Sequence, residues 1–390
     1  MSKLEELIQK YCPDGVEYRP LWSLTAWDKK FNGIEDKSKQ KRVIKYNYLL
    51  AADLKSYQVE GGTVKLLTTN ISNLYTSEEL AEGLASDGEV VAIPWGGNPV
   101  VQYYKGRFLT ADNRIATSLD TTLLNNKFLY YCMLSQLKLI ASFYRGSGIK
   151  HPDMAKVLDL EIPIPPLPVQ EEIVRILDTF TELQTELQTE LQKRLQQYNY
   201  YRDNLLSFDG RTDVEWKKLG EVSSVLRGKR LTKSQLSEDG KYKVFHGGID
   251  PIGFFEQYNR EGSTTMVINV GASAGTVGFS KERFWSSDGC FCLSHSSLFS
   301  GRYLYYYLQT KEPYLMSRVR RAGIPTLDGK VLEELLIPVP SLSEQQRIVD
   351  ILDKFDALTT DLTAGLPAEI EKRRLQYEYY RDKLLTFKRK

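Results

Sequence analysis

Apolar residues recur at intervals of three and four positions in two widely separated stretches of the chain. These positions are Ile173, Ile176, Leu177 and Phe180 in the first stretch, and Ile348, Ile351, Leu352 and Phe355 in the second. Such spacing places the apolar side chains on one face of an amphipathic helix. The pattern therefore predicts the same helix twice.

Each predicted helix follows alternating prolines, in residues 162–165 (Ile-Pro-Ile-Pro) and 337–340 (Ile-Pro-Val-Pro), which favour an extended approach. The tetrapeptide Thr-Glu-Leu-Gln then occurs three times over residues 181–192. It begins a row of leucines four residues apart, which are Leu183, Leu187, Leu191 and Leu195. The corresponding row in the second copy is Leu358, Leu362, Leu366 and Ile370. Because that copy contains Gly365-Leu-Pro367, we expect a kink or a short break there.

Both helical runs end in the same aromatic signature. Residues 198–208 (Tyr-Asn-Tyr-Tyr-Arg-Asp-Asn-Leu-Leu-Ser-Phe) match residues 377–387 (Tyr-Glu-Tyr-Tyr-Arg-Asp-Lys-Leu-Leu-Thr-Phe) at eight of eleven positions. A continuous helix from Gln170 to Leu206 would be about 55 Å long, which corresponds to roughly 16 base pairs of B-DNA. We expect the two long helices to pack on each other in antiparallel fashion, because neither can bury its apolar face alone.

The segments before the helices alternate short β-branched and aromatic runs with Gly, Asn and Asp, as in residues 90–97 and 265–272, and so predict strands and loops. The offset between the copies, from Gln170 to Gln345, far exceeds the roughly 20–50 residues of a solenoid repeat and indicates a duplicated domain. We predict an α+β fold with two mixed α/β globular domains, two long antiparallel helices resembling a coiled coil, and an internal pseudo-two-fold. The predicted segments are residues 1–165, 166–209, 210–341 and 342–390, the first and third globular and the others helical.

Composition narrows the class of protein without naming a ligand. The 390 residues are 42% hydrophobic and 26% charged, as in ordinary globular proteins, and the net charge of +2 does not by itself indicate nucleic acid. The sequence contains no run of 18 apolar residues, so it does not predict a membrane span, and the charged N-terminus does not resemble a signal peptide. Four cysteines without a framework spacing suit a reducing cytoplasm.

Catalytic motifs are missing from the sequence. Gly228-Lys229 lacks the earlier glycine of a phosphate-binding loop, and the glycines of residues 271–278 have the wrong spacing for a dinucleotide fingerprint. The Asn/Asp-Pro-Pro-aromatic motif of amino-methyltransferases is also absent. Cys290, Cys292 and His295 resemble metal ligands but lack a fourth partner, so buried strand cysteines are favoured. We predict neither a catalytic residue nor a metal site.

Basic residues gather beside glycines and in short runs, and two of these groups occupy equivalent places in the two copies. The candidate DNA-binding residues are Lys39, Lys41, Arg42, Lys45, Arg145, Lys150, Arg227, Lys229, Arg230, Arg318, Arg320 and Arg321. Arginine in such a turn can contact phosphate or bind guanine through two hydrogen bonds. A solvated surface run is the alternative for each group, and the recurrence in both copies weighs against it.

A second set of candidates lies on the helices and is assigned to subunit docking or helix pairing. It comprises Ile173, Leu177, Phe180, Arg202, Asp203, Ile348, Leu352, Phe355, Arg381 and Asp382. The tyrosines of the signature would also allow base stacking, but their helical spacing favours a core or a protein–protein face.

Taken together, these motifs resemble the specificity (S) subunit of type I restriction-modification systems. The resemblance rests on the proline segment before Gln170 and Gln345, the Ile-Val-x-Ile-Leu-Asp-x-Phe helix, the aromatic signature, the duplication and the tetrapeptide repeat. Residues 271–278 with 284–288, and residues 95–97 with 110–114, look like parts of two target-recognition domains. The unequal helices depart from exact symmetry.

The resemblance implies that each recognition domain reads one half of an asymmetric, bipartite site in double-stranded DNA. It further implies that the helices dock two methyltransferase (modification) subunits, which use S-adenosylmethionine and flip the target adenine. Restriction/translocase subunits would add ATP- and Mg²⁺-dependent translocation and cleavage. This chain would bind none of these cofactors. The alternatives are a helical scaffold that bridges two proteins without reading DNA, and a self-contained methyltransferase or nuclease.

Overall fold

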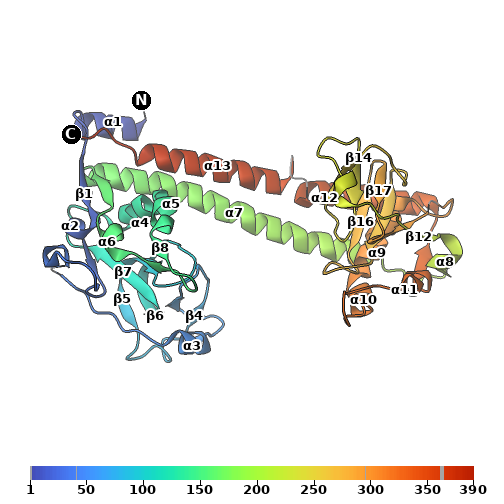
Figure 1. Cartoon of the computed structure of the whole chain (residues 1–390), viewed down its shortest axis with the longest axis horizontal. Coiled ribbons are helices and arrows are strands. Elements are labelled where there is room, and N and C mark those ends of the chain that lie inside the picture. Colours follow the sequence, from blue (N-terminus) through green and yellow to red (C-terminus); the bar gives the residue numbers. More distant parts are fainter. Residues whose placement is uncertain (1, 41, 295, 361–363) are drawn as a thin grey trace. The chain divides into compact units, whose positions relative to one another are not determined.

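The computed structural model describes residues 2–40, 42–294, 296–360 and 364–390 (Figure 1). It forms two compact units, of which unit 1 contains Met1–Glu186 with Glu371–Lys390 and unit 2 contains Leu187–Ile370. The long helix α7 (Leu167–Leu205) contributes one segment to each unit. The four predicted segments follow the sequence repeat rather than compactness, and their boundaries stay predictions.

Unit 1 combines short helices with a mixed sheet. Its helices are α1 (Lys3–Tyr11), α2 (Leu21–Leu24), α3 (Ala51–Leu54), α4 (Asn126–Ser135), α5 (Leu137–Ser142) and α6 (Met154–Leu158), with 3-10 turns at Lys37–Gln40 and Lys55–Tyr57. Its strands are β1 (Glu17–Pro20), β2 (Thr25–Trp27), β3 (Val64–Leu67), β4 (Tyr75–Thr76), β5 (Ser86–Pro94), β6 (Gln102–Thr110), β7 (Asn113–Ser118), β8 (Tyr144–Arg145), β9 (His151–Pro152) and β10 (Glu161–Ile164). The main sheet has the strand order β2-β7-β5-β6-β3-β4, in which β3 and β6 run parallel.

Unit 2 has the same order of parts but other sheets. Its helices are α8 (Leu219–Val222), α9 (Gly301–Thr310), α10 (Glu312–Ser317), α11 (Gly329–Glu333), α12 (Leu342–Thr360) and the start of α13 (Leu366–Leu384), with a 3-10 turn at Lys233–Gln235. Its strands are β11 (Glu215–Lys218), β12 (Val225–Arg227), β13 (Tyr242–Phe245), β14 (Gly253–Phe255), β15 (Thr264–Ile268), β16 (Val277–Ser280), β17 (Phe284–Ser286), β18 (Cys290–Leu293) and β19 (Leu336–Val339). One sheet has the order β12-β18-β15-β16 and another the order β14-β13-β17.

A small sheet precedes the long helix in each unit. In unit 1 it pairs β1 with β10, and in unit 2 it pairs β11 with β19, both antiparallel. The proline-containing strands β10 and β19 lie in these two-stranded sheets because proline cannot donate a ladder hydrogen bond. The extended segments predicted before the helices are confirmed.

A buried glutamine fastens each helix to its unit. The amide nitrogen of Gln170 donates to the carbonyls of Leu123 (2.8 Å) and Pro165 (2.7 Å), and its oxygen accepts from the backbone N–H of Asn125 (2.9 Å). In unit 2 the amide of Gln345 makes the corresponding bonds, which join it to Leu298 (2.8 Å), Pro340 (2.9 Å) and the N–H of Ser300 (3.0 Å). Both glutamines are fully buried, so three strong hydrogen-bonding groups in each unit depend on one side chain.

A carboxylate further along each helix makes a second fastening. Asp178 accepts from the Lys127 ammonium (2.7 Å) and from the Tyr131 hydroxyl (2.6 Å). The counterparts at the equivalent positions of unit 2 are Asp353, Arg302 and Tyr306, and Arg302 also bonds to Asp356. The duplicated helix is thus attached to α4 and α9 by the same pattern of contacts.

The predicted helices are present, with one interruption. The helix α7 has 39 residues and continues through the Thr-Glu-Leu-Gln array, where Thr181 and Thr185 hydroxyls donate to carbonyls four residues earlier. The second copy consists of α12 and α13, and the described residues directly before Leu366, Ala364 and Gly365, form a turn and a bend, so the break expected near Gly365 is confirmed. Leu362 lies outside the described residues.

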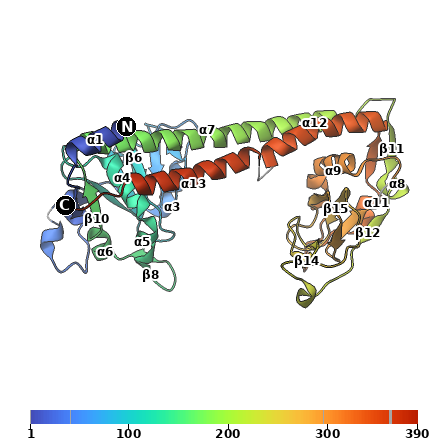
Figure 2. The ribbon, with the colours of Figure 1, turned by 90° about the horizontal axis from the view of Figure 1, so that it is seen from above.

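Helix pairing is seen inside each unit. In unit 1 the Phe180 ring lies against Tyr377 (6.5 Å) and Tyr380 (5.6 Å), so that the first segment of α7 runs antiparallel to the end of α13 (Figures 1 and 2). In unit 2 the Tyr201 ring stacks on Phe355 at 5.5 Å. A mixed α/β fold with a long helix and a repeat-like two-domain architecture is therefore confirmed.

The end of the chain closes unit 1 beside β1. Val16 N–H donates to the Lys388 carbonyl (2.8 Å), and Lys390 N–H donates to the Val16 carbonyl (3.1 Å). The Tyr18 hydroxyl donates to the Phe387 carbonyl at 3.1 Å. Residues 206–214 make the corresponding connection in unit 2 as one continuous segment between α7 and β11.

Candidate DNA interface

The turn after β5 holds three segments of unit 1 together. Trp95 N–H donates to the Asp112 carbonyl (2.7 Å), and the Trp95 carbonyl accepts from His151 Nδ1 (2.7 Å), which must carry the proton because a carbonyl cannot donate. Gly97 adopts φ +98 and donates to the Lys150 carbonyl (3.1 Å). These contacts join the β6–β7 turn and the β8–β9 hairpin. We call residues 95–97, 112–114 and 144–152 the reading turns of unit 1.

Cations surround the Trp95 ring. The Arg114 guanidinium lies 4.4 Å from the ring centroid and the Lys29 ammonium lies 5.3 Å from it. Arg114 also pairs with Asp28 (3.1 Å), and both side chains are buried. Partial burial and the nearby Arg114 charge lower the pKa of Lys29. Trp95 and Arg114 are therefore fixed in place, whereas Lys29 is the more accessible cation at this site.

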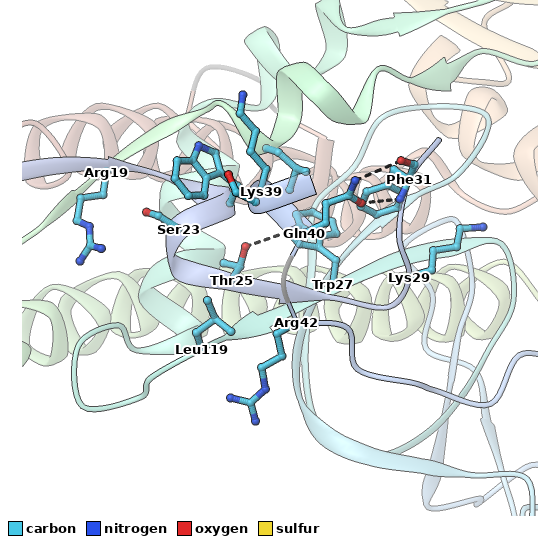
Figure 3. A pocket seen from close by; sticks show the side chains of 13 residues that line it. Arg19, Ser23, Thr25, Trp27, Lys29, Phe31, Lys39, Gln40, Arg42 and Leu119 are labelled. Carbon is cyan, nitrogen blue, oxygen red and sulfur yellow. Dashed lines mark hydrogen bonds between the residues drawn. The ribbon is translucent and has the colours of Figure 1, made fainter. Parts of the chain in front are cut away.

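Lys29 lines three cavities of unit 1, among the residues that the structure describes. The first, about 320 Å³, is also lined by Arg19, Lys39 and Arg42 (Figure 3). The second, about 510 Å³, contains Trp95, and the third, about 350 Å³, contains Lys45 and Arg114. This part of unit 1 therefore presents hollows that are rich in positive charge.

The structure places the first group of predicted DNA-binding residues around these cavities. The Lys39 ammonium already forms an ion pair with the Asp159 carboxylate at 2.5 Å. Arg42 and Lys45 are exposed. Lys41 lies outside the described residues. Arg145 and Lys150 are exposed on the β8–β9 hairpin, beside the Trp95 turn.

Unit 2 joins its own turns by backbone hydrogen bonds. Gly271 N–H donates to the Pro325 carbonyl (2.9 Å) and Asn269 N–H donates to the Gly289 carbonyl (3.0 Å). Arg320 and Thr326 exchange two backbone bonds of 2.9 and 3.1 Å, which close a hairpin. We call residues 269–271, 287–289 and 319–327 the reading turns of unit 2.

Two predicted basic groups meet at these turns. The Arg227 side chain donates to the Asp288 carbonyl (3.4 Å), and Lys229 N–H donates to the Ser286 carbonyl (2.9 Å). Arg230, Arg320 and Arg321 are exposed, and Arg318 lies over the Tyr314 ring at 5.0 Å. Residues far apart in the sequence are thus brought onto neighbouring turns. The assignment of individual side chains to DNA remains a prediction.

The predicted helix residues divide into a buried set, a partly buried set, and two exposed carboxylates, Asp203 and Asp382. Ile173, Leu177, Ile348 and Leu352 are fully buried in the cores of their units, so they are unavailable to a partner subunit. Phe180 and Phe355 make the ring contacts described above. Arg202 donates to Asp203 and lies 5.6 Å from the Tyr198 ring; Arg381 repeats this with Asp382 and Tyr377, at 5.7 Å.

Two helix residues that the sequence-based list omits are strongly exposed. Tyr200 is 67% exposed and its counterpart Tyr379 is 62% exposed. Each ring contacts its neighbouring tyrosine, Tyr201 or Tyr380, which in turn stacks on Phe355 or Phe180. The repeated Tyr-x-Tyr-Tyr motif was the feature of the sequence that could have identified these two exposed tyrosines. Its middle tyrosine faces outward in both units, whereas Tyr198 and Tyr377 are buried.

No group of metal-ligating residues is found among the described residues. The Cys290 thiol donates to the His246 carbonyl (2.6 Å), and burial raises the pKa values of Cys290 and Cys292. His295 lies outside the described residues. Within the described part of the chain, no helix has the length and apolar character needed to cross a membrane.

Comparison with known proteins defines the class. The family model described as "Type I restriction modification DNA specificity domain" matches residues 87–197 and 212–372. A putative type I restriction enzyme specificity subunit of Haemophilus influenzae is 36% identical over 338 residues, covering 80% of this chain and 86% of that protein. The EcoR124I/EcoR124II specificity subunit of Escherichia coli is 34% identical over 304 residues, covering 70% and 74%.

Solved structures agree in fold. The type I restriction-modification S subunit from M. genitalium gives a TM-score of 0.64 at 21% identity and covers 96% of this chain and 97% of that one. The family match and the two relatives, with the fold in agreement, define a DNA-specificity subunit, a recognition protein rather than an enzyme. This chain belongs to the type I restriction-modification DNA specificity family. The matches do not support the two alternatives, a scaffold without DNA reading and a self-contained methyltransferase or nuclease.

Proposed function

We propose that each unit reads one half of an asymmetric, bipartite site in double-stranded DNA. The observation that carries this proposal is a repeated attachment, made by Gln170 and Gln345, of two recognition domains whose sheets differ. Equal attachment gives both domains the same role, and different strands and turns give them different base preferences. Direct readout depends on the donors and acceptors that a turn presents in the groove.

The reading turns supply the contacts in this proposal. In unit 1, Arg145 and Lys150 contact the sugar-phosphate backbone of the DNA, and the cavities around Lys29 accept phosphates or base edges. In unit 2, Arg227, Lys229 and Arg230 lie on the turn beside residues 287–289, next to the arginines of the 319–327 hairpin. Phosphate contacts fix the position of a protein on DNA, whereas base contacts give specificity.

The partners of this chain are two methyltransferase subunits, one for each unit, and further restriction/translocase subunits. The outward-facing Tyr200 and Tyr379, with the Arg202–Asp203 and Arg381–Asp382 pairs beside them, are the proposed docking positions. Tyrosine and arginine are enriched among the residues that carry most of the binding energy at the centres of protein interfaces. The partner subunits, and not this chain, use S-adenosylmethionine, ATP and Mg²⁺. The complex works in the cytoplasm, where its DNA is.

The test is to express the chain with its methyltransferase subunits and to map methylated adenines across a genome. We expect one asymmetric sequence made of two half-sites with a spacer of constant length. A footprint of the purified complex should then show two protected half-sites. Methylation at a single continuous site, or a complex that leaves DNA unprotected, would contradict the proposal.

A further inference from the structure

One apolar side chain stands at the tip of a basic hairpin in each unit. Ile149 belongs to the β8–β9 hairpin and Ile324 to the 319–327 hairpin, and the two positions are equivalent in the sequence repeat. Each isoleucine is 70% exposed. A single exposed apolar residue is ordinary on a protein surface. The same residue at the same place in two copies requires a common reason.

Both hairpins hold their tips in a defined position. The first is closed by the pairs Tyr144↔Pro152 and Arg145↔His151, and the second by the paired Arg320 and Thr326. Glycine allows the sharp turn in each, since Gly146 has φ +143 and Gly323 has φ +81. Each hairpin is also bonded to a glycine turn, through Gly97 and Lys150 or through Gly271 and Pro325. The isoleucines therefore project from braced turns.

The surroundings of the two tips match a polyanion. Arg145 and Lys150 flank Ile149, while Arg318, Arg320 and Arg321 precede Ile324. All five cations are exposed. An apolar tip beside cations resembles the wedge that DNA-bending proteins insert between base pairs while neighbouring cations hold the phosphates. A docking site for an apolar protein surface would not require these positive charges.

We propose that Ile149 and Ile324 are a pair of DNA wedges, one for each half-site, which insert between adjacent base pairs. This inference rests on the proposed function, in which the two half-sites differ in sequence. Features common to both units cannot distinguish those sequences, so they contact what the half-sites share. A base step that is opened beside the base to be modified is such a shared feature, since unstacking must precede base flipping.

The test uses the chain assembled with its methyltransferase subunits, after the methylated site has been mapped. Duplexes carry 2-aminopurine, whose fluorescence rises on unstacking, at successive positions of each half-site. We expect a local rise in both half-sites with the unaltered complex. Ile149→Ala should abolish the rise in one half-site and Ile324→Ala in the other, each with about tenfold weaker binding. Ile149→Leu should restore the signal.

The control is Ile71→Ala, because Ile71 is 74% exposed in unit 1 but lies outside the reading turns. It should leave fluorescence and affinity unchanged. If the alanine variants bind and unstack DNA like the unaltered complex, the wedge is wrong although DNA reading stands. If they lose the methyltransferase subunits on gel filtration instead, the hairpins are protein-docking elements and the wedge is again wrong. Absence of any protected half-site with the unaltered complex would refute the proposed function itself.

Discussion

Units 1 and 2 share the contacts that attach a recognition domain to its helix, yet they build that domain from different sheets. The hydrogen bonds of Gln170 and Gln345 correspond one by one. Unit 1 has the strand order β2-β7-β5-β6-β3-β4, whereas unit 2 divides its strands between β12-β18-β15-β16 and β14-β13-β17. The difference teaches that attachment and reading are separable, because the strands change without disturbing the glutamine bonds.

The units also differ in how they close. Unit 2 continues through residues 206–214 from α7 into β11. In unit 1 the corresponding segment, the end of the chain, is held beside β1 by non-covalent contacts. Arg389 lies over the Tyr18 ring (4.3 Å) and pairs with Glu161 (2.6 Å). Unit 1 also has the helix α1, which has no counterpart before β11 among the described residues. Two units of one origin are therefore stabilised by partly different means.

Exchange of residues 1–160 for another recognition domain of this family should have the largest effect. One half-site should be replaced entirely and the other retained, because the boundary leaves Gln170 and its helix in place. Methylome sequencing of cells that express the hybrid with its partners would measure this. Simultaneous change of both half-sites would show that the units do not read independently.

Removal of one Thr-Glu-Leu-Gln repeat from α7 should change the spacer and nothing else. The deletion shortens the helix by about 6 Å. We expect identical half-sites and a spacer altered by about one base pair, with DNA flexibility taking up the rest.

The matched control replaces the leucine of one repeat, Leu187→Ala, at constant length. Its methylome should show the original spacer. New half-site sequences in the deletion variant, or an unchanged spacer, would contradict the idea that α7 sets the distance.

The repeated elements and several segments of the reading turns, such as residues 95–97 and 110–114, were found from the sequence, whereas the contacts that join the turns were not. Spacing alone located the helices, the proline strands and the break near Gly365, because these depend on local periodicity and on backbone chemistry. The Asp28–Arg114 pair joins residues 86 positions apart. The parallel pairing of β13 with β17 likewise depends on distant segments. Neither leaves a local pattern, so the contacts of Asp28, Lys29 and Arg114 around Trp95 could be seen only once the sheet was formed.

Replacement of the buried glutamine in each unit should destabilise that unit, and the two losses of stability should be similar. Gln170→Leu or Gln345→Leu leaves one N–H and two carbonyls without partners in a buried site, which should lower the free energy of unfolding by about 2–4 kcal/mol. Urea denaturation measures it. The exposed neighbour provides the control, since Gln346→Leu loses one bond to Asp350 and should change stability by less than about 0.5 kcal/mol. A large loss for one buried glutamine and none for the other would show that the attachments are not equivalent.

The smallest predicted difference between the units is how acid affects the ion pairs at the start of their helices. Glu172 is bound by Arg175 through two hydrogen bonds (2.6 and 3.1 Å) and by Lys3 of α1 (2.7 Å). The Arg175 and Lys3 partners lower the pKa of Glu172 to about 2. The equivalent position in unit 2 is Arg347, which carries the opposite charge and pairs with Glu344 three residues earlier. Arg347 and Arg211 lower the pKa of Glu344 as well.

Because the folded state holds Glu172 ionised, its contribution is complete above a pH of about 4.5 and is lost as the pH falls toward 2. Glu172→Gln should therefore lower the free energy of unfolding by about 1–3 kcal/mol at pH 7, and the difference from the unaltered chain should shrink between pH 4.5 and 2.5. Glu344→Gln should have a smaller effect at pH 7, because that side chain is 23% exposed whereas Glu172 is 3% exposed. Urea denaturation at pH 7, 5 and 3 distinguishes the two. A Glu172 effect that stayed constant down to pH 3 would mean that the carboxylate acts through its shape and packing rather than through its charge.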